Sequence, residues 1–161
     1  MTPVITRVQI RGYRKFQDFT FEPEVGTNII VGGNEAGKST LLEAMTLALA
    51  GRVNGVHAAE YLNPYWFNHT MVHDFFEKPP NERSHRDAPT FRIDVYLDVE
   101  SGELEKLRGV NNMANADSVG LSIWAHPDPE YMQELDDYFQ QDDCPEVLPV
   151  EYYMVEWLSF G

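Results

Sequence analysis

Residues 27–50 read TNIIVGGNEAGKSTLLEAMTLALA. In this stretch an apolar run meets a glycine-rich turn, and a long segment of helical apolar periodicity follows without a break. The turn matches the phosphate-loop pattern G-x-x-x-x-G-K-[ST] from Gly32 to Ser39, in the strand-then-helix context that the pattern requires. The alternative is a glycine turn that only caps a core helix. The stretch predicts a binding loop for the phosphates of a nucleoside triphosphate.

The residue types of this loop suit a bound phosphate chain. Glycines let the backbone turn its N–H groups inward and approach the anion closely, and the start of a helix directs a positive dipole end at the same point. Lys38 is the candidate catalytic residue, since its ammonium group reaches the β- and γ-phosphates of ATP, and the Ser39 hydroxyl is a candidate ligand of Mg²⁺. The candidate nucleotide-binding residues of this segment are Gly32, Gly33, Asn34, Glu35, Ala36, Gly37, Lys38, Ser39 and Thr40.

Length and composition indicate one domain over residues 1–161, with 43% hydrophobic and 24% charged residues, as in a soluble globular protein. No apolar run approaches the roughly 20 residues of a membrane-spanning helix. The N-terminus lacks the pattern of a signal peptide. Cys144 is the only cysteine, which excludes an internal disulfide and fits a reducing cytosol. We therefore expect a cytoplasmic protein with no membrane partner.

Charge is distributed unevenly along the chain. Residues 1–40 have a net charge of +1 and residues 41–161 a net charge of −15, with no Lys or Arg after Arg108. Surfaces that grip nucleic acid cluster Lys and Arg. If DNA is a partner, the acidic part of the chain is not expected to grip it.

The pattern of apolar residues predicts strands and helices in a mixed order rather than a regular strand–helix series, and so a mixed sheet with a large antiparallel part. A turn is expected at Gly12–Arg14, and a polar, mobile loop at 81–89. The helix after the phosphate loop is expected to be buried on most sides and to end at Gly51. The predicted strands cover 4–11, 16–21, 27–31, 90–99, 119–125 and 150–160, and the predicted helices cover 38–50, 69–76 (capped by Asn68), 102–107 and 129–141.

Three stretches together resemble a known family. The loop from Gly32 to Ala44 is similar to that of the ABC-type ATPases related to RecF and the structural-maintenance-of-chromosomes (SMC) proteins. The element Gly12–Phe16 (GYRKF) is similar to that family's "N/G-F-R-x-F" element. The later strands and the ending PVEYYMVEWLSF resemble the OLD (overcoming lysogenization defect) ATPases within the group.

This resemblance implies an α/β (mixed α+β) fold of the P-loop NTPase kind: the N-terminal lobe of an ABC-type ATPase head, with a largely antiparallel sheet around the P-loop helix. By position, Asn34 would line the loop and Arg14 would lie near the nucleotide. OLD proteins carry a Toprim-type nuclease after the ATPase and are associated with DNA processing and phage defence. DNA would then be a partner only through the full-length protein, in which two heads would sandwich ATP.

The chain departs from the family pattern in lacking an "LSxGQ"-like segment, a terminal Walker B strand and Toprim residues. We therefore expect an N-terminal fragment, a half-site that binds ATP and scarcely hydrolyses it. Two alternatives stay open: a small P-loop kinase with Arg83 and Arg86 as lid arginines, and a non-catalytic, nucleotide-gated interaction module. Asp98 and Glu100 could imitate a Walker B pair, or face solvent on an alternating strand.

Two further groups of residues are candidates for binding. His69 and His73 stand four residues apart, as metal-binding histidines on a helix do, but no third ligand is evident. Tyr65, Trp66 and Phe67 could stack on a nucleic-acid base, or belong to the core.

Overall fold

The computed structural model describes residues 4–23, 38–53, 56–99 and 102–161. The strands of this part are β1 (Val4–Tyr13), β2 (Phe16–Phe21), β3 (Arg52–Val53), β4 (Val56–His57), β5 (Phe91–Asp98), β6 (Arg108–Gly109), β7 (Ser118–Pro127) and β8 (Tyr153–Ser159). The helices are α1 (Lys38–Ala50), α2 (His69–Glu77) and α3 (Met132–Phe139). Short 3-10 turns are η2 (Ala58–Glu60), η3 (Pro64–Trp66), η4 (Pro80–Glu82), η5 (His85–Asp87), η6 (Glu103–Leu107), η7 (Pro129–Tyr131) and η8 (Val150–Tyr152).

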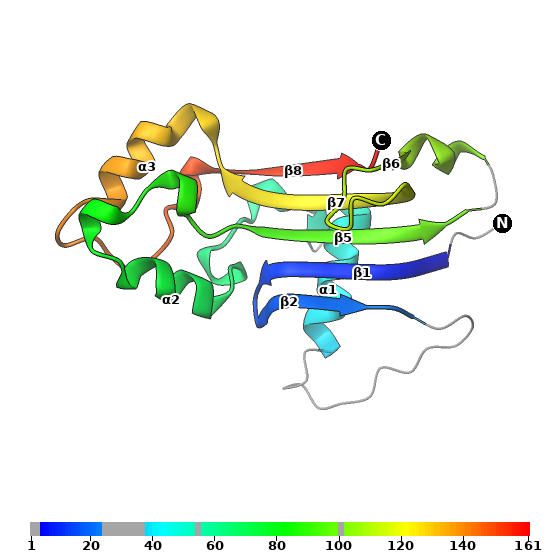
Figure 1. Cartoon of the computed structure of the whole chain (residues 1–161), viewed down its shortest axis with the longest axis horizontal. Coiled ribbons are helices and arrows are strands. Elements are labelled where there is room, and N and C mark those ends of the chain that lie inside the picture. The colour runs from blue at the N-terminus through cyan, green and yellow to red at the C-terminus, as the bar shows by residue number, and fades with distance from the viewer. Residues whose placement is uncertain (1–3, 24–37, 54–55, 100–101) are drawn as a thin grey trace.

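One antiparallel sheet organises the described chain. Its strands run in the order β2-β1-β5-β7, and β6 and β8 both pair with the edge of β7 that β5 leaves free. Helix α1 crosses one face of the sheet and packs against β1, β5 and β7 (Figure 1). The architecture is therefore mixed α/β with an antiparallel sheet, as the sequence predicts.

The alternation of apolar residues along the strands explains the core. Successive side chains of a strand point to opposite faces, so alternate residues in the middle of β1, β5 and β7 lie on the face of the sheet that α1 covers. Burying a single Val, Leu, Ile or Phe side chain contributes roughly 1.5–3 kcal/mol. The buried residues between sheet and helix include Val8, Ile10, Ile93, Val95, Ile123 and Ala125 from the strands and Leu41, Ala44, Leu47 and Ala48 from α1.

Helix α1 begins and ends where the sequence predicts, but it is less buried than expected. Gly51 ends it with φ +62° and donates its N–H to the Leu47 carbonyl at 2.7 Å, as a glycine after a helix does. The prediction of burial on most sides is wrong, because Leu42 is 48% and Leu49 38% exposed. Among the described residues the sheet covers one side of α1, and these two leucines lie away from it.

The hairpin between β1 and β2 turns later than predicted. Gly12 and Tyr13 continue β1, and the turn itself lies at Arg14 and Lys15. Gly12 has φ +75°, and a Cβ placed on it would lie 2.3 Å from the Thr90 carbonyl oxygen. A glycine is needed at this position because β1 passes too close to the next segment for any side chain.

Helices α2 and α3 lie together at the end of the sheet where β1 ends and β5 begins (Figure 1). Asn68 caps α2 as predicted, with its side-chain oxygen accepting the Met71 N–H at 3.1 Å. Residues 81–89, predicted to be a mobile polar loop, instead contribute to two 3-10 turns and bury Arg83. The polar contacts that the Arg83 side chain makes fix the course of this segment. The composition of the segment does not reveal these contacts.

Other boundaries differ by a few residues. The predicted helix over 129–141 begins as the 3-10 turn η7, because the Asp128 side chain and Pro129 favour a tight first turn, and continues as α3. The predicted strand over 150–160 also begins with a 3-10 turn, η8. The predicted strand over 27–31 lies outside the described residues. None of the helices in the described part of the chain has the length and apolar character to cross a membrane.

Substitution of Gly12 tests the close approach of β1 to the Thr90 carbonyl. Gly12→Ala is expected to lower the free energy of unfolding by about 2–5 kcal/mol, since it adds the strain of a positive φ to a collision with the Thr90 carbonyl. Urea unfolding measures the loss. The matched control is Gly102→Ala, where φ is +112° but a Cβ would have no atom within 4 Å, so only backbone strain of about 1–3 kcal/mol is expected. Equal losses in the two variants would contradict the close approach.

Candidate nucleotide-binding site

The candidate site lies around the first turns of α1. Lys38, Ser39 and Thr40 form the first turn of the helix, and the side chains of Lys38 and Ser39 are exposed. Residues 32–37, the rest of the predicted phosphate loop, lie outside the described residues. The start of a helix carries unpaired backbone N–H groups and a partial positive charge. No acidic residue lies in this first turn, so it suits a phosphate chain.

Arg14, which the family resemblance assigns to the nucleotide, is bound to the same helix. Its Nε lies 2.8 Å from Oε1 of Glu43 in α1. Glu43 is four residues after Ser39 and therefore lies on the same side of the helix, one turn further on. The structure thus brings Arg14 beside the side of α1 that carries Ser39, although 29 residues separate Arg14 from Glu43 in the sequence.

Tyr13 completes this contact from inside the core. Its ring is fully buried, and its hydroxyl donates a hydrogen bond to the Glu43 carboxylate. Burial, and then the bond to Glu43, raise the pKa of Tyr13 above its ordinary value, so the hydroxyl stays protonated and remains a donor. Burial opposes the charge of Arg14, but its contacts with Tyr13 and Glu43 raise the pKa of this arginine, which stays cationic. Glu43 was not among the predicted site residues.

The backbone of Arg14 is held in an unusual conformation. Its φ of +48° is uncommon for a residue with a side chain. Its N–H donates to the Trp66 carbonyl at 2.7 Å, and its own carbonyl accepts the Asn68 side-chain N–H at 2.9 Å. Strained backbone persists only where surrounding contacts determine it, and such positions concentrate at functional sites. The side chain of Arg14 is therefore presented from a fixed turn.

The aromatic residues 65–67 divide between core and surface. Trp66 and Phe67 are buried and pack edge-on against Phe91, so they are core residues rather than a stacking surface for bases. Tyr65 is 75% exposed. The carbonyl of Trp66 supports Arg14, which gives this segment a structural part in the site.

Asp98 of the Walker B alternative is not brought to the start of α1. Asp98 ends β5 opposite Val4, at the far end of β1 from Tyr13 and Arg14. A strand of this length separates the two ends by roughly 30 Å. Asp98 is exposed, as the solvent-facing alternative predicts, and Glu100 lies outside the described residues.

The paired histidines lie on α2 without further ligands. Their rings stack with centroids 6.4 Å apart, and His73 Nε2 lies 3.4 Å from Glu77. The described residues contain no group of three or more His, Cys, Asp and Glu side chains that could hold a metal ion.

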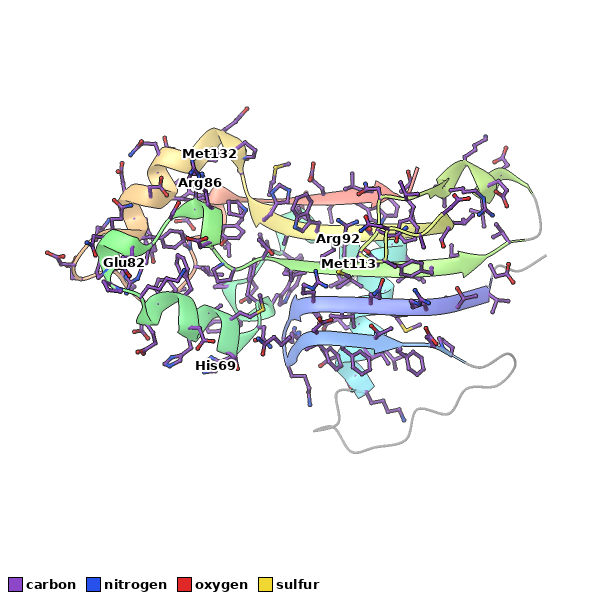
Figure 2. The ribbon with its side chains drawn as sticks, in the orientation of Figure 1. His69, Glu82, Arg86, Arg92, Met113 and Met132 are labelled. Carbon is purple, nitrogen blue, oxygen red and sulfur yellow. The ribbon has the colours of Figure 1, made fainter. Side chains whose placement is uncertain are left out.

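Arg83, proposed as a lid arginine in the kinase alternative, has a structural role. It is buried, and its guanidinium donates to the carbonyls of Phe76 at 2.6 Å, Lys78 at 3.0 Å and Phe139 at 3.3 Å. It thereby joins the end of α2 to the end of α3. Arg86 is exposed on η5, beside α3 and away from the start of α1 (Figure 2). The structure therefore gives no support to the lid interpretation.

Known protein families and proteins match parts of this chain. A family model described as "AAA domain" matches residues 7–113. A segment of 49 residues, 30% of this chain, is 47% identical to the DNA double-strand break repair Rad50 ATPase of Methanopyrus kandleri, of which it covers 6%. A segment of 45 residues, 28% of this chain, is 49% identical to the DNA replication and repair protein RecF of Pseudoalteromonas atlantica, of which it covers 12%. The chain thus matches only a small part of the length of these relatives.

Substitution of the two arginines of the lid interpretation is expected to change the free energy of unfolding by different amounts. Arg83→Ala is expected to lower the free energy of unfolding by about 2–4 kcal/mol, because buried carbonyls lose a charged donor. Arg86→Ala, the exposed control, is expected to change it by less than about 0.5 kcal/mol. Thermal and urea unfolding measure both. A loss of ATP affinity in either variant without a loss of stability would restore the lid interpretation.

Proposed function

The chain belongs to the AAA-domain family and is similar to RecF- and SMC-like ABC ATPases, and from this we propose that it is the ATP-binding N-terminal lobe of such an ATPase. The observation that supports the proposal is the start of α1, where exposed Lys38 and Ser39 and the docked Arg14 lie around one helix end. A helix start that carries a basic and a hydroxyl-bearing residue and no acidic residue in its first turn suits the phosphates of a nucleotide.

Lys38, Arg14 and Ser39 each have a separate role in the proposed binding of ATP. Lys38 balances the charge of the β- and γ-phosphates, and backbone N–H groups at the start of α1 add donors. Arg14, held by Glu43, presents its remaining guanidinium N–H groups beside the same helix. The exposed Ser39 hydroxyl would hold Mg²⁺ as in a phosphate loop, and Mg²⁺ would supply neutralisation of the phosphate charge.

The finer assignment concerns the full-length protein. We propose an OLD-type ATPase that couples ATP hydrolysis to DNA processing or phage defence in the cytoplasm, with two heads closing on ATP and an endonuclease function elsewhere in the protein. The resemblance of the last strands to OLD ATPases supports this, and the relatives named above are DNA-repair proteins. This lobe alone is then a half-site, which binds ATP and turns it over very slowly.

A second function, a nucleotide-gated interaction module, is supported by the exposed leucines of α1. Leu42 and Leu49 are seven residues apart and so lie on one side of the helix that begins at the site. Nucleotide binding at the start of α1 could thus alter an apolar contact along the same helix. This function predicts ATP-dependent self-association without turnover, measurable by size-exclusion chromatography with and without Mg-ATP.

Titration calorimetry with Mg-ATP tests nucleotide binding directly. The chain is expected to bind, and Lys38→Ala to weaken binding at least tenfold, because a charge-assisted contact to phosphate is lost. Lys106→Ala is the matched control, since this lysine is exposed on η6 and its loss is expected to leave affinity unchanged. No binding at millimolar ATP would defeat the proposal. A clear steady-state ATPase rate abolished by Lys38→Ala would contradict the half-site.

Glu43 is expected to act through Arg14. In Glu43→Gln, Arg14 loses its ionic partner and its fixed position, and ATP affinity is expected to fall by about three- to tenfold. Glu105→Gln offers a control, because Glu105 forms a similar exposed pair with Arg108 far from α1. If Glu43→Gln lowers stability but leaves ATP affinity unchanged, Arg14 does not serve the nucleotide.

A further inference from the structure

The sheet has a second face, turned away from α1, which carries an unexpected row of side chains. The register of the strands aligns Arg11 of β1, Arg92 of β5 and Trp124 of β7 directly across one another. Alternation places these three residues on the face opposite to the core residues that meet α1. The candidate nucleotide site on α1 makes no use of this row.

Next to the row, on the same face of the sheet, lies the fully buried carboxylate of Asp94, two residues after Arg92 in β5. Asp94 accepts hydrogen bonds from Arg92 Nε at 2.9 Å, from the Ser122 hydroxyl at 2.5 Å and from the Met113 N–H at 2.7 Å. The bond from Met113 holds the loop around this residue against the sheet, and the bond from Arg92 Nε fixes the orientation of the guanidinium. Arg92 Nη2 adds bonds to the Ser122 hydroxyl at 3.1 Å and the Asn111 carbonyl at 2.9 Å.

One end of the Arg92 guanidinium is not used by this network. Nη1 makes no hydrogen bond to the described residues, and the Arg92 side chain is 19% exposed. Arg92 lines a hollow of about 190 Å³ together with Arg11, Thr90, Met113 and Trp124. Figure 2 shows Arg92 and Met113 next to each other over the middle of the sheet.

A purely structural role explains only part of this arrangement. A buried charged pair is weak evidence for stability, because apolar residues of similar volume often replace it without loss. The network accounts for Asp94, for Nε and for Nη2, and the guanidinium carbon lies 5.9 Å from the centre of the Trp124 ring, but Nη1 has no hydrogen bond to the described residues and Arg92 lines the hollow. Arg11 stands beside it with 56% of its side chain exposed and only a loose contact to Asp18 at 3.9 Å, which an anion can replace.

We propose that this hollow binds the phosphate monoester of a nucleotide, independently of the site on α1. Arg92 Nη1 and Arg11 supply N–H donors from two guanidinium groups, and such donors bind phosphate oxygens through charge-assisted hydrogen bonds. The hollow exceeds the 150 Å³ or so that holds a benzene ring, so it accepts the phosphate group, and the rest of the nucleotide lies along Trp124 and Met113. The phosphate belongs either to a free nucleotide or to the 5′ end of a single strand.

The test uses the whole chain carrying Lys38→Ala, which weakens the α1 site at least tenfold, and reads binding at the hollow from the Trp124 signal. Calorimetry and the NMR shift of the Trp124 indole N–H are followed with AMP, inorganic phosphate and a short oligothymidylate with either a 5′-phosphate or a 5′-hydroxyl end. Binding of AMP identifies a free nucleotide, and binding of the 5′-phosphorylated strand alone identifies a strand end. Either result supports the proposal, and no binding of AMP or of the phosphorylated strand at about 10 mM overturns it.

A pair of matched variants separates this site from general surface charge. Arg11→Gln is expected to weaken binding about tenfold, the loss of one charge-assisted contact. Arg7→Gln is the control, because Arg7 lies on the same strand and face, bound to Glu22 and outside the hollow. Equal effects of the two variants, or no effect of Arg11→Gln, overturn the proposal. Neither variant removes a partner of the buried Asp94.

Discussion

The Glu43 carboxylate joins the N-terminal hairpin to the helix that begins at Lys38. It accepts hydrogen bonds from the buried Tyr13 hydroxyl and from Arg14 Nε. The first comes from within the core and the second from the strained turn that follows it. Because one acceptor serves both donors, the end of β1, the turn and the second turn of α1 hold one another in place. The position of Arg14 beside α1 depends on this contact.

The antiparallel sheet makes that contact possible and gives the molecule two different faces. Its strands alternate, so one face is apolar and carries α1, while the other bears arginines and a tryptophan around a buried aspartate. The same alternation that builds the core therefore leaves a polar face available for a separate purpose. The two candidate sites lie on opposite sides of one sheet and share no residue.

Positively charged side chains in this protein contact individual oxygens rather than form one broad basic surface. The chain carries a net charge of −14, yet three arginines of the described part are each placed against specific oxygens. Arg14 faces Glu43, Arg83 faces three carbonyls, and Arg92 faces Asp94. Such single, oriented cations suit recognition of individual phosphate groups better than a non-specific grip on a nucleic-acid duplex.

The sequence by itself determined the long strands β1, β2, β5, β7 and β8 to within a few residues, the start and end of α1, the cap at Asn68 and the candidate residues Lys38 and Ser39. These follow from alternation, capping and a contiguous motif, which are local properties of the chain. Only the tertiary structure decided that Glu43 meets Arg14, that Arg83 is buried, and that Arg92 lies beside Arg11 and Trp124. Those contacts depend on strand register and on packing between segments far apart in the sequence, and no local pattern encodes either.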